Sequence, residues 1–142
     1  PITLVFARTR DLDGVKEALV ARRTLAWLDR QVWGDAALLR ALWVASVTPQ
    51  PANGTVGAEV QVSVQNTSAI AFDLHVVGAP TWLTLSDAIL AAESTTVVKG
   101  RLAADAPAGS HAVDLAVEIR NLQPQSGTAL EASLPLSITV GR

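Results

Sequence analysis

The sequence predicts a mainly β protein in which an antiparallel β-sandwich follows a short α/β segment. Beyond residue 58, apolar and polar residues alternate with a period of two in a series of short segments. Clusters of turn-forming residues separate these segments. The first 48 residues differ, because they carry one continuous apolar run and two stretches with helical periodicity.

The N-terminal segment begins with a strand and a helix. Ile2 to Ala7 is a continuous apolar run, which is typical of a strand covered on both faces, as in a parallel sheet. Asp11 is placed to cap the next helix, and Arg22 and Arg23 follow as cations near its negative end. The expected buried stripe of this helix is formed by Leu12, Val15, Ala18 and Leu19. Thr24 to Trp27 is expected to form a second short strand.

A second helix follows, for which Asp35 is the expected cap. Trp43 and Val44 make this helix apolar over more than half of its circumference, so it is expected to be covered from two sides. Its main apolar face is formed by Ala37, Leu38, Ala41, Leu42 and Ala45. The turn-forming stretch PQPANGT at 49–55 then predicts a domain boundary, with one domain at 1–48 and the other at 49–142.

The second domain is expected to contain about seven short strands of an immunoglobulin-like sandwich. The chain contains no cysteine, so the sandwich is not of the antibody type and holds no disulfide. Pro135 interrupts the last strand and predicts an edge or a bulge there. With a lead-in at 47–48, the expected strands lie within 59–65, 70–76, 82–85, 96–102, 113–120 and 134–140.

Composition excludes several classes of partner. The net charge of −2 predicts no electrostatic binding to nucleic acid or to an anionic membrane. No apolar run reaches the ~20 residues of a membrane helix, and no secretion signal is visible at the N-terminus. The sequence fits a cytoplasmic, periplasmic or secreted location. It contains no methionine and begins directly on a strand, so we expect a chain cut from a longer protein.

Four short motifs follow one another in the N-terminal segment: the strand Thr3 to Ala7 (TLVFA), the turn Glu17-Ala18-Leu19, the basic Arg22-Arg23-Thr24 and the aromatic strand at Trp27. On these motifs, the segment resembles the closing part of the PHP (polymerase and histidinol phosphatase) domain. More narrowly, it resembles the phosphodiesterase-like branch that carries a β-sandwich after the barrel. The later stretch ADAPAGSHAVDLAVEIR is similar to a hairpin of bacterial immunoglobulin-like accessory domains.

This resemblance implies that residues 1–48 are the incomplete C-terminal end of a PHP-type α/β barrel. The parent enzyme would hold two or three divalent metals (Mn, Zn or Fe) that activate water for attack at phosphorus. Its metal ligands would lie upstream of this segment, so no catalytic, cofactor-binding or metal-binding residue is assigned to this chain. The implied partner is the upstream barrel of the same protein, and self-association is expected through the exposed apolar N-terminal segment.

The two histidines give no clear site. His75 falls on the polar side of its strand, and His111 is expected at a rim. They lie on different strands, and no carboxylate is spaced as a partner, so a two-histidine metal site is disfavoured. Ser110, His111 and Asp114 lack the elbow motif of a serine hydrolase and are dismissed as a triad.

The remaining candidates favour structural roles over ligand binding. Arg22 and Arg23 either contact phosphate in the parent enzyme or, preferably, lie on a solvated turn. The cluster Trp27, Trp33 and Trp43 is either a ligand platform or, preferably, packing between the barrel and the sandwich. Trp82 is expected to anchor the sandwich core. The triplets at 53–55 and 66–68 match glycosylation acceptors but are interpreted as turns.

Two functions therefore remain open. In the first, the chain is the non-catalytic C-terminal portion of a metal-dependent PHP-family phosphoesterase. In the second, it is a free-standing immunoglobulin-like binding or adhesion module with a helical N-terminal extension. The opening strand discriminates between them, because pairing within the sandwich favours the module and isolation from the sandwich favours the enzyme portion.

Overall fold

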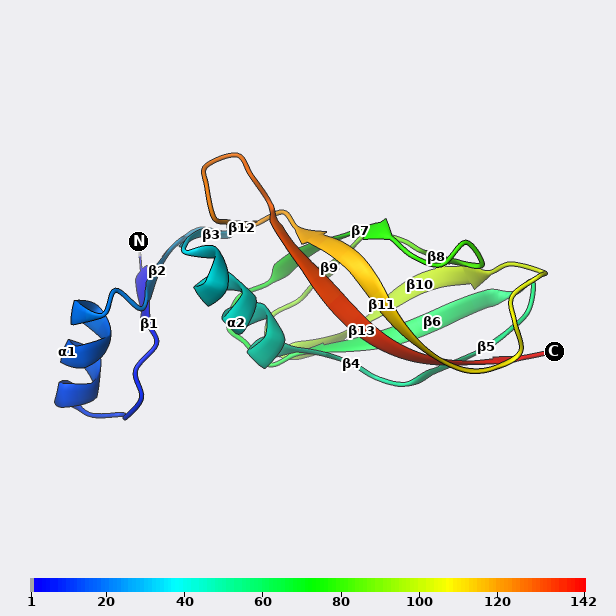
Figure 1. Cartoon of the computed structure of the whole chain (residues 1–142), viewed down its shortest axis with the longest axis horizontal. Coiled ribbons are helices and arrows are strands. Elements are labelled where there is room, and N and C mark those ends of the chain that lie inside the picture. The colour runs from blue at the N-terminus through cyan, green and yellow to red at the C-terminus, as the bar shows by residue number, and fades with distance from the viewer. Residues whose placement is uncertain (1) are drawn as a thin grey trace.

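The computed structural model describes residues 2–142 and shows an elongated molecule with a small α/β unit at one end (Figure 1). The α/β unit, residues 2–34, contains β1 (Ile2–Val5), α1 (Leu12–Val20), β2 (Thr24–Leu28) and β3 (Gln31–Gly34). Helix α2 (Ala36–Ser46) connects this unit to the sandwich, residues 47–141. Neither of the helices within residues 2–142 is long and apolar enough to cross a membrane.

The sandwich consists of two sheets. One has the strand order β4-β6-β10-β8 and the other the order β5-β13-β11-β7-β9. All neighbours pair antiparallel except β5 and β13, which run parallel. The strands are β4 (Val47–Pro49), β5 (Ala52–Thr55), β6 (Glu59–Asn66), β7 (Phe72–Gly78), β8 (Leu83–Leu85), β9 (Ala88–Leu90), β10 (Ser94–Leu102), β11 (Gly109–Ile119) and β13 (Leu130–Gly141). The predicted mainly β sandwich is therefore confirmed.

The alternating residues of the long strands form the core between the two sheets. On β6, Val60, Val62 and Val64 are buried while the residues between them face outward. The same pattern holds on the other long strands, and it buries Phe72, Leu74, Val98, Leu102, Leu115, Val117, Ile119, Leu134, Leu136, Ile138 and Val140. The period of two identified these strands correctly because each has one buried and one solvated face.

Both side edges of the sandwich are formed by chain that crosses from one sheet to the other. At one edge, β4 pairs with β6, and only two residues later β5 pairs with the last strand, β13. At the other edge, β8 pairs with β10 and β9 then pairs with β7. The edge strands are consequently three or four residues long, which limits pairing with other chains.

Two sequence expectations fail at these edges. The stretch PQPANGT was expected to be entirely turn, but Ala52–Thr55 forms β5, because the parallel partner β13 supplies hydrogen bonds that local sequence does not reveal. Pro135 was expected on an edge strand or beside a bulge, but β13 lies between β5 and β11 and pairs with β11 in unbroken register around Pro135. Because β5 pairs only with Ile138–Gly141, the side of β13 away from β11 has no partner strand at Pro135.

The α/β unit holds its own sheet, with the order β1-β2-β3-β12. Strand β1 pairs antiparallel with β2, so the expected parallel strand covered on both faces is wrong. The short strand β12 (Leu122–Gln123) comes from the sandwich half of the sequence and pairs parallel with β3. β1 pairs with no strand of the sandwich and forms the outer edge of this small sheet.

Helix α2 packs the α/β unit onto the sandwich. Asp35 caps it as expected, since its carboxylate accepts a hydrogen bond from the Ala37 backbone amide at 2.8 Å. Its buried face is formed by Leu39, Trp43 and Ser46. The alanines of the predicted face are exposed instead. Burying the large Trp43 and Leu39 removes more apolar area from water than burying alanine would, and this decides the orientation of the helix.

Candidate functional site

His75 lies on the outer face of the five-stranded sheet and has a carboxylate partner. Its Nδ1 lies 2.8 Å from Oδ1 of Asp87, which also accepts a hydrogen bond from the Val76 amide. The guanidinium of Arg120 is 3.8 Å from the other carboxylate oxygen. The hydrogen bond from His75, assisted by the charges of His75 and Arg120, lowers the pKa of Asp87.

The expectation that no carboxylate partners a histidine is therefore wrong for His75. Asp87 lies in the segment between β8 and β9, and the crossing of that segment between the sheets places it against β7. An oriented imidazole beside a carboxylate is one part of a general-base arrangement. The hydroxyl of the neighbouring Ser86 donates to the carbonyl of Lys99, so it is not hydrogen-bonded to His75.

His111 belongs to a different surface. Its Nε2 lies 2.8 Å from the carbonyl oxygen of Pro107, and Ser110 forms a hydrogen bond with Thr139 at 3.2 Å. The hydrogen bonds of Ser110 and His111 therefore go to Thr139 and Pro107 and not to each other. Within residues 2–142, no group of three or more histidine, cysteine, aspartate or glutamate side chains is placed to hold a metal ion.

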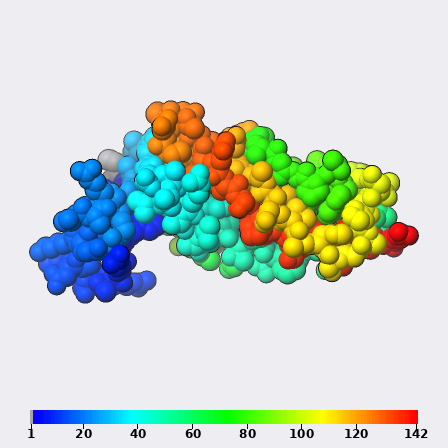
Figure 2. All heavy atoms as spheres, in the orientation of Figure 1, coloured from blue at the N-terminus to red at the C-terminus, as the bar shows by residue number. Residues whose placement is uncertain are grey.

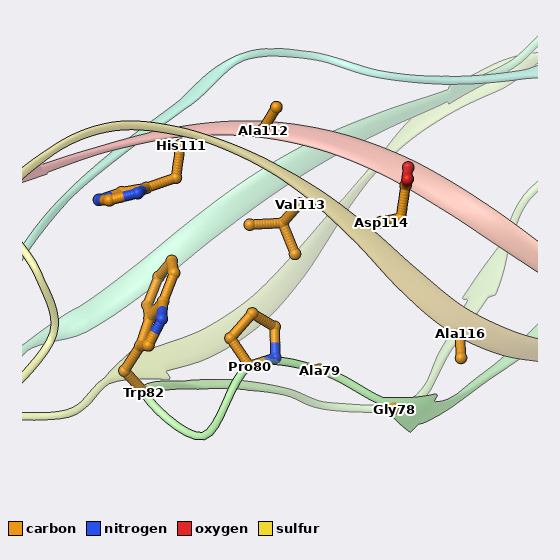
Figure 3. A pocket seen from close by; sticks show the side chains of 9 residues that line it. All are labelled: Gly78, Ala79, Pro80, Trp82, His111, Ala112, Val113, Asp114 and Ala116. Atoms are coloured by element: carbon orange, nitrogen blue, oxygen red, sulfur yellow. The ribbon is translucent and has the colours of Figure 1, made fainter.

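Trp82 lies at the rim of the sandwich rather than in its core. It is half-buried, and its ring centroid lies 5.2 Å from that of His111 with an interplanar angle of 52°. The two rings border an open cleft of about 430 Å³ between the β7–β8 loop and the first half of β11 (Figure 3). The expectation that Trp82 anchors the core is thus corrected, because the indole only packs against its margin.

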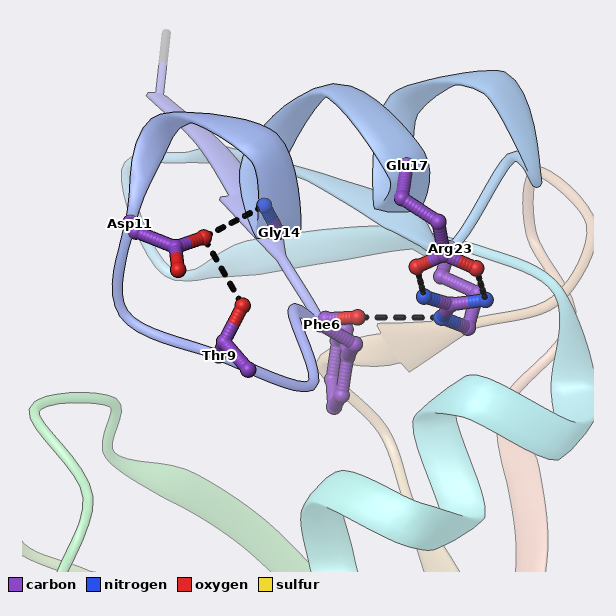
Figure 4. Close-up of polar contacts among 6 residues, drawn as sticks. All are labelled: Phe6, Thr9, Asp11, Gly14, Glu17 and Arg23. Carbon is purple, nitrogen blue, oxygen red and sulfur yellow. Dashed lines mark hydrogen bonds and ion pairs between the residues drawn. The ribbon is translucent and has the colours of Figure 1, made fainter.

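The loop between β1 and α1 is held by polar contacts (Figure 4). Asp11 caps α1 as predicted, accepting hydrogen bonds from the Gly14 amide at 2.6 Å and from the Thr9 hydroxyl at 2.8 Å. These two bonds, that from Gly14 foremost, lower the pKa of the Asp11 carboxyl.

Arg23 connects α1 to Phe6, the residue that follows β1. It forms a bidentate ion pair with Glu17, and its Nε donates to the Phe6 carbonyl at 3.0 Å. The Arg23 hydrogen bonds lower the pKa of Glu17. Arg22 is exposed, with a left-handed φ of 57° just after the helix. Both arginines lie beyond the last turn of α1, so neither is a cation of that turn. The contacts of Arg23 with Glu17 and Phe6 give it a structural role within the α/β unit.

The α/β unit exposes an unusual amount of apolar surface. Of the predicted stripe of α1 only Ala18 is buried, whereas Leu12 is 67% and Leu19 is 50% exposed. Val20 is 85% exposed, and Ile2 on β1 is 55% exposed. Large exposed apolar patches indicate an interaction surface. The space-filling view shows that this unit projects from the sandwich, so the exposed side chains are not covered by the rest of the chain (Figure 2).

The seam between the α/β unit and the sandwich is formed by α2, β3 and residues 121–123. Trp43 is 2% exposed, meets Phe72 edge to face at 5.5 Å and donates its indole N–H to the Ser133 carbonyl. Trp33 donates its indole N–H to Gln123 Oε1 at 3.1 Å. Both tryptophans lie at this seam as predicted, and Trp27 packs against the same apolar cluster.

Asn121 is the principal polar residue of the seam, and sequence reasoning missed it. Its side-chain amide donates to the carbonyls of Arg30 and Ala71, both at 2.7 Å, and its Oδ1 accepts from the Asp73 amide. Its backbone carbonyl accepts from Val32. The position after a strand of alternating residues looks like an ordinary turn, and no local signal reveals partners about 50 and 90 residues away.

The glycosylation triplets have different outcomes. Asn66 is 1% exposed and its amide donates to the Ile70 and Leu90 carbonyls. Its Oδ1 accepts from the Ser68 amide, which confirms the predicted turn. Asn53 instead lies within β5, so the turn predicted there is wrong.

Comparison with solved structures finds proteins to which this chain is similar. The chain is similar to a two-domain protein from Bacteroides vulgatus ATCC 8482 that contains a predicted PHP-like metal-dependent phosphoesterase. The identity is 25% and the TM-score 0.74, and the match covers 94% of this chain and 38% of that chain. A protein of unknown function from Porphyromonas gingivalis W83 matches at 18% identity and a TM-score of 0.40, over 67% of this chain and 47% of that chain. No family model and no curated protein matches the sequence.

The extent of the first match is informative. Because 94% of the chain is matched, the similar region includes most of the α/β unit together with the sandwich. The chain spans a little over one third of the length of that neighbour. The combination of α/β unit and sandwich is therefore shared with part of a protein that has a PHP-like domain.

Proposed function

We propose that this chain is the non-catalytic C-terminal portion of a longer, metal-dependent PHP-type phosphoesterase. The observation that carries the proposal is the match to the two-domain protein, which covers almost all of this chain but only 38% of the neighbour. The resemblance of residues 1–48 to the end of a PHP domain points in the same direction. In this proposal, catalysis belongs to the part of the protein that precedes residue 1.

The exposed apolar surface of the α/β unit supports an attached partner. Leu12, Leu19 and Val20 project from α1, and β1 is an edge strand with one unpaired side. A covering domain would remove this apolar area from water at about 25 cal/mol per Å². We propose that the upstream barrel of the same protein covers this surface. The α/β unit would then contact the barrel, and the sandwich would lie outside that contact.

The residues present do not fit a resident metal site. Residues 2–142 bring together no three ligands of the type that Mn, Zn or Fe requires, and His75 is already paired with Asp87. The two or three divalent metals that the family resemblance implies would be held upstream. The roles left to this chain are to complete the fold of the catalytic domain and to hold the sandwich beside it.

The test uses the complete coding sequence that contains this chain. We expect the full-length protein to hydrolyse a phosphate ester such as bis(p-nitrophenyl) phosphate with Mn²⁺ and to lose this activity with a chelator. The 142-residue chain alone should neither hydrolyse the ester nor bind Zn²⁺ or Mn²⁺ tightly in calorimetry. An upstream sequence without clustered histidines and aspartates, or a full-length protein without metal-dependent hydrolysis, would contradict the proposal.

The alternative is a free-standing immunoglobulin-like binding module with a helical N-terminal extension. One observation favours it: β12 pairs with β3 and thereby joins the α/β sheet to the sandwich half of the chain. Sedimentation of the 142-residue chain distinguishes the two functions. A monodisperse monomer would favour the module, whereas self-association through the exposed apolar residues is expected of an excised portion.

A further inference from the structure

An open cleft lies at the sandwich end farther from the α/β unit (Figures 1 and 3). Small side chains leave it open, because Gly78, Ala79, Ala112 and Ala116 are among its lining residues. The pairing of β7 and β11 shifts its register between Val117 and Ala116, where β7 has one extra residue, and it ends at the pair Ala116 and Gly78. Irregular pairing of this kind is common beside functional sites.

Trp82 presents an unsatisfied donor at this cleft. The indole N–H groups of Trp27, Trp33 and Trp43 donate to Asp29, Gln123 and Ser133, respectively. Trp82 has no such partner within residues 2–142, although no buried side-chain nitrogen or oxygen there is left unpaired. Its indole N–H is therefore reachable from solvent, and it borders a cleft that could hold an acceptor.

His111 supplies the complementary acceptor. Since the Pro107 carbonyl can only accept, Nε2 of His111 carries the hydrogen of this 2.8 Å contact. In the neutral ring, Nδ1 is then a bare acceptor, and it has no hydrogen-bond partner within the described residues. Figure 3 shows the side chains of Trp82, Pro80, Val113 and His111 turned toward one shared space, while Asp114 points away from it.

The lining chemistry selects among ligand classes. The cleft has no lysine or arginine, and Asp114 stands at its margin, so a phosphate or carboxylate would meet repulsion without a cationic partner. An ammonium group only donates and would leave the indole N–H unpaired. An acyl chain would dehydrate both the indole N–H and the imidazole nitrogen without replacing their hydrogen bonds with water.

A sugar ring meets all of these conditions. Each hydroxyl both donates and accepts, so neighbouring hydroxyls can pair with the indole N–H and with the imidazole nitrogen. The C–H face of the ring can pack against the apolar surfaces of Trp82 and Pro80. We propose that the cleft bordered by Trp82 and His111 is a carbohydrate-binding site of the sandwich, independent of any phosphoesterase activity.

The test follows the four indole N–H signals of the ¹⁵N-labelled 142-residue chain by NMR. The probes are methyl glycosides of glucose, galactose, mannose and N-acetylglucosamine, and tetrasaccharides of the same sugars. We expect at least one of them to shift the Trp82 signal saturably at concentrations up to about 10 mM, in the range of weak single-site affinity. The signals of Trp33 and Trp43, which lie at the seam, should not move.

Variants locate the site. Trp82→Phe keeps an aromatic ring but removes the N–H and should weaken binding about fivefold, as expected for one hydrogen bond. His111→Ala should weaken it by a similar factor. Binding to both variants is followed through the Val113 amide, because Trp82→Phe lacks the indole signal. Trp27→Phe is the matched control, because Trp27 is also half-buried but lies on the α/β unit, and it should leave the affinity unchanged.

Three results would overturn the proposal. One is the absence of a saturable shift for every saccharide. Another is a shift of the Val113 amide that persists unchanged in both cleft variants while their melting temperatures match the parent chain. The third is saturable binding of tetramethylammonium or hexanol at this cleft without saccharide binding. None of these results bears on hydrolysis by the full-length protein, so the two proposals fail separately.

Discussion

The α/β unit and the sandwich differ in how many large apolar side chains they expose. Six of the ten large apolar side chains that are exposed in residues 2–142 lie in the first 28 residues: Ile2, Leu12, Val15, Leu19, Val20 and Leu28. The sandwich, about three times longer, holds three, and α2 holds one. The sandwich also blunts both of its edges with very short strands. The difference shows that the sandwich leaves few large apolar side chains exposed, whereas the outer face of the α/β unit exposes most of those in this chain.

The two regions are nevertheless joined by one continuous core. Leu25 and Val32 of the small sheet belong to the same buried cluster as Trp43 of α2 and Phe72 of the sandwich. The inner face of the α/β unit is therefore satisfied within this chain, and only its outer face lacks cover. This asymmetry yields four predictions, given from the largest expected effect on stability to the smallest.

Removing α2 should have the largest effect. A chain starting at Asp35 keeps Leu39 and Trp43 in the core, whereas a chain starting at Pro49 loses both, together with Val47 of β4. Loss of a buried tryptophan alone costs about 3–5 kcal/mol. We expect the free energy of unfolding in urea to be lower for the shorter chain by at least about 3 kcal/mol.

Equal stability of the two chains would show that residues before 49 do not stabilise the sandwich, as the predicted boundary between residues 48 and 49 implies. Circular dichroism should report a β-type spectrum for the chain starting at Asp35. This comparison therefore decides whether α2 belongs to the sandwich or to the α/β unit.

Asn121→Ala should loosen the connection between the two regions. The change removes hydrogen bonds to the Arg30 and Ala71 carbonyls and from the Asp73 amide. Buried or half-buried groups left unpaired cost about 1–3 kcal/mol each, so a total near 3 kcal/mol is expected. Hydrogen exchange should speed up in the β2–β3 hairpin more than in β6 or β10.

Asn53→Ala is the control for this change, because Asn53 is an exposed residue of β5 with no side-chain hydrogen bond within residues 2–142. It should shift the free energy of unfolding by less than about 0.5 kcal/mol. Uniform acceleration of exchange over the whole chain in Asn121→Ala would argue against a local connecting role.

Acid should weaken the contact between Asp87 and His75. Because folding lowers the pKa of Asp87, the contact stabilises the fold above the carboxyl's ordinary pKa of 3.8 and loses this effect as the pH falls through the lowered value. Asp87→Asn should therefore reduce the melting temperature slightly at pH 7. The difference from the parent chain should vanish when the pH falls below the lowered pKa of Asp87.

The control is Asp105→Asn, since Asp105 is exposed and forms no hydrogen bond or ion pair within residues 2–142. Its melting temperature should follow that of the parent chain at every pH. A difference between Asp87→Asn and the parent that persists undiminished in acid would mean that the Asp87 contact is not ionic.

Charges on the outer face of α1 should change association but not stability. Leu19 and Val20 are at least half exposed, so replacing both with lysine should move the melting temperature by no more than about 2 °C. The same change should reduce the expected self-association of the 142-residue chain in sedimentation velocity. Leu4 and Phe6 are unsuitable for this purpose, because they pack against the buried cluster.

Val97→Lys provides the comparison on the sandwich. Val97 is 48% exposed, similar to Leu19, but lies on β10 away from the α/β unit. It should leave the association unchanged. Equal effects of the two changes would mean that association arises from general surface hydrophobicity and not from the outer face of the α/β unit.

The long strands of the sandwich could be predicted because each carries its own signal. β6, β10, β11 and β13 have one buried and one exposed face, and alternation over eight or more residues records this directly. Both helix caps were also predicted, since an aspartate before a helix acts locally.

Several of the short strands were missed because so few residues carry no recognisable pattern. β3, β9 and β12 have two to four residues each, too few to show a period. Strand β5 reads ANGT, a typical turn sequence, and becomes a strand only because β13 lies beside it. The contact between Asp87 and His75 follows from the same cause, as the crossing of β8 and β9 between sheets brings them together.

The pairing of β5 with β13 also determines when the chain can finish folding during its synthesis. A ribosome releases β5 long before Ile138–Gly141, with which β5 must pair. The small sheet likewise forms completely only after Leu122–Gln123 is synthesised, because β3 pairs with these residues. Contacts of such long sequence separation form slowly, and emerging segments that await their partners are prone to aggregation. We therefore expect nascent chains that stop before β13 to depend on chaperones, and to be released from them only when the last strand leaves the exit tunnel.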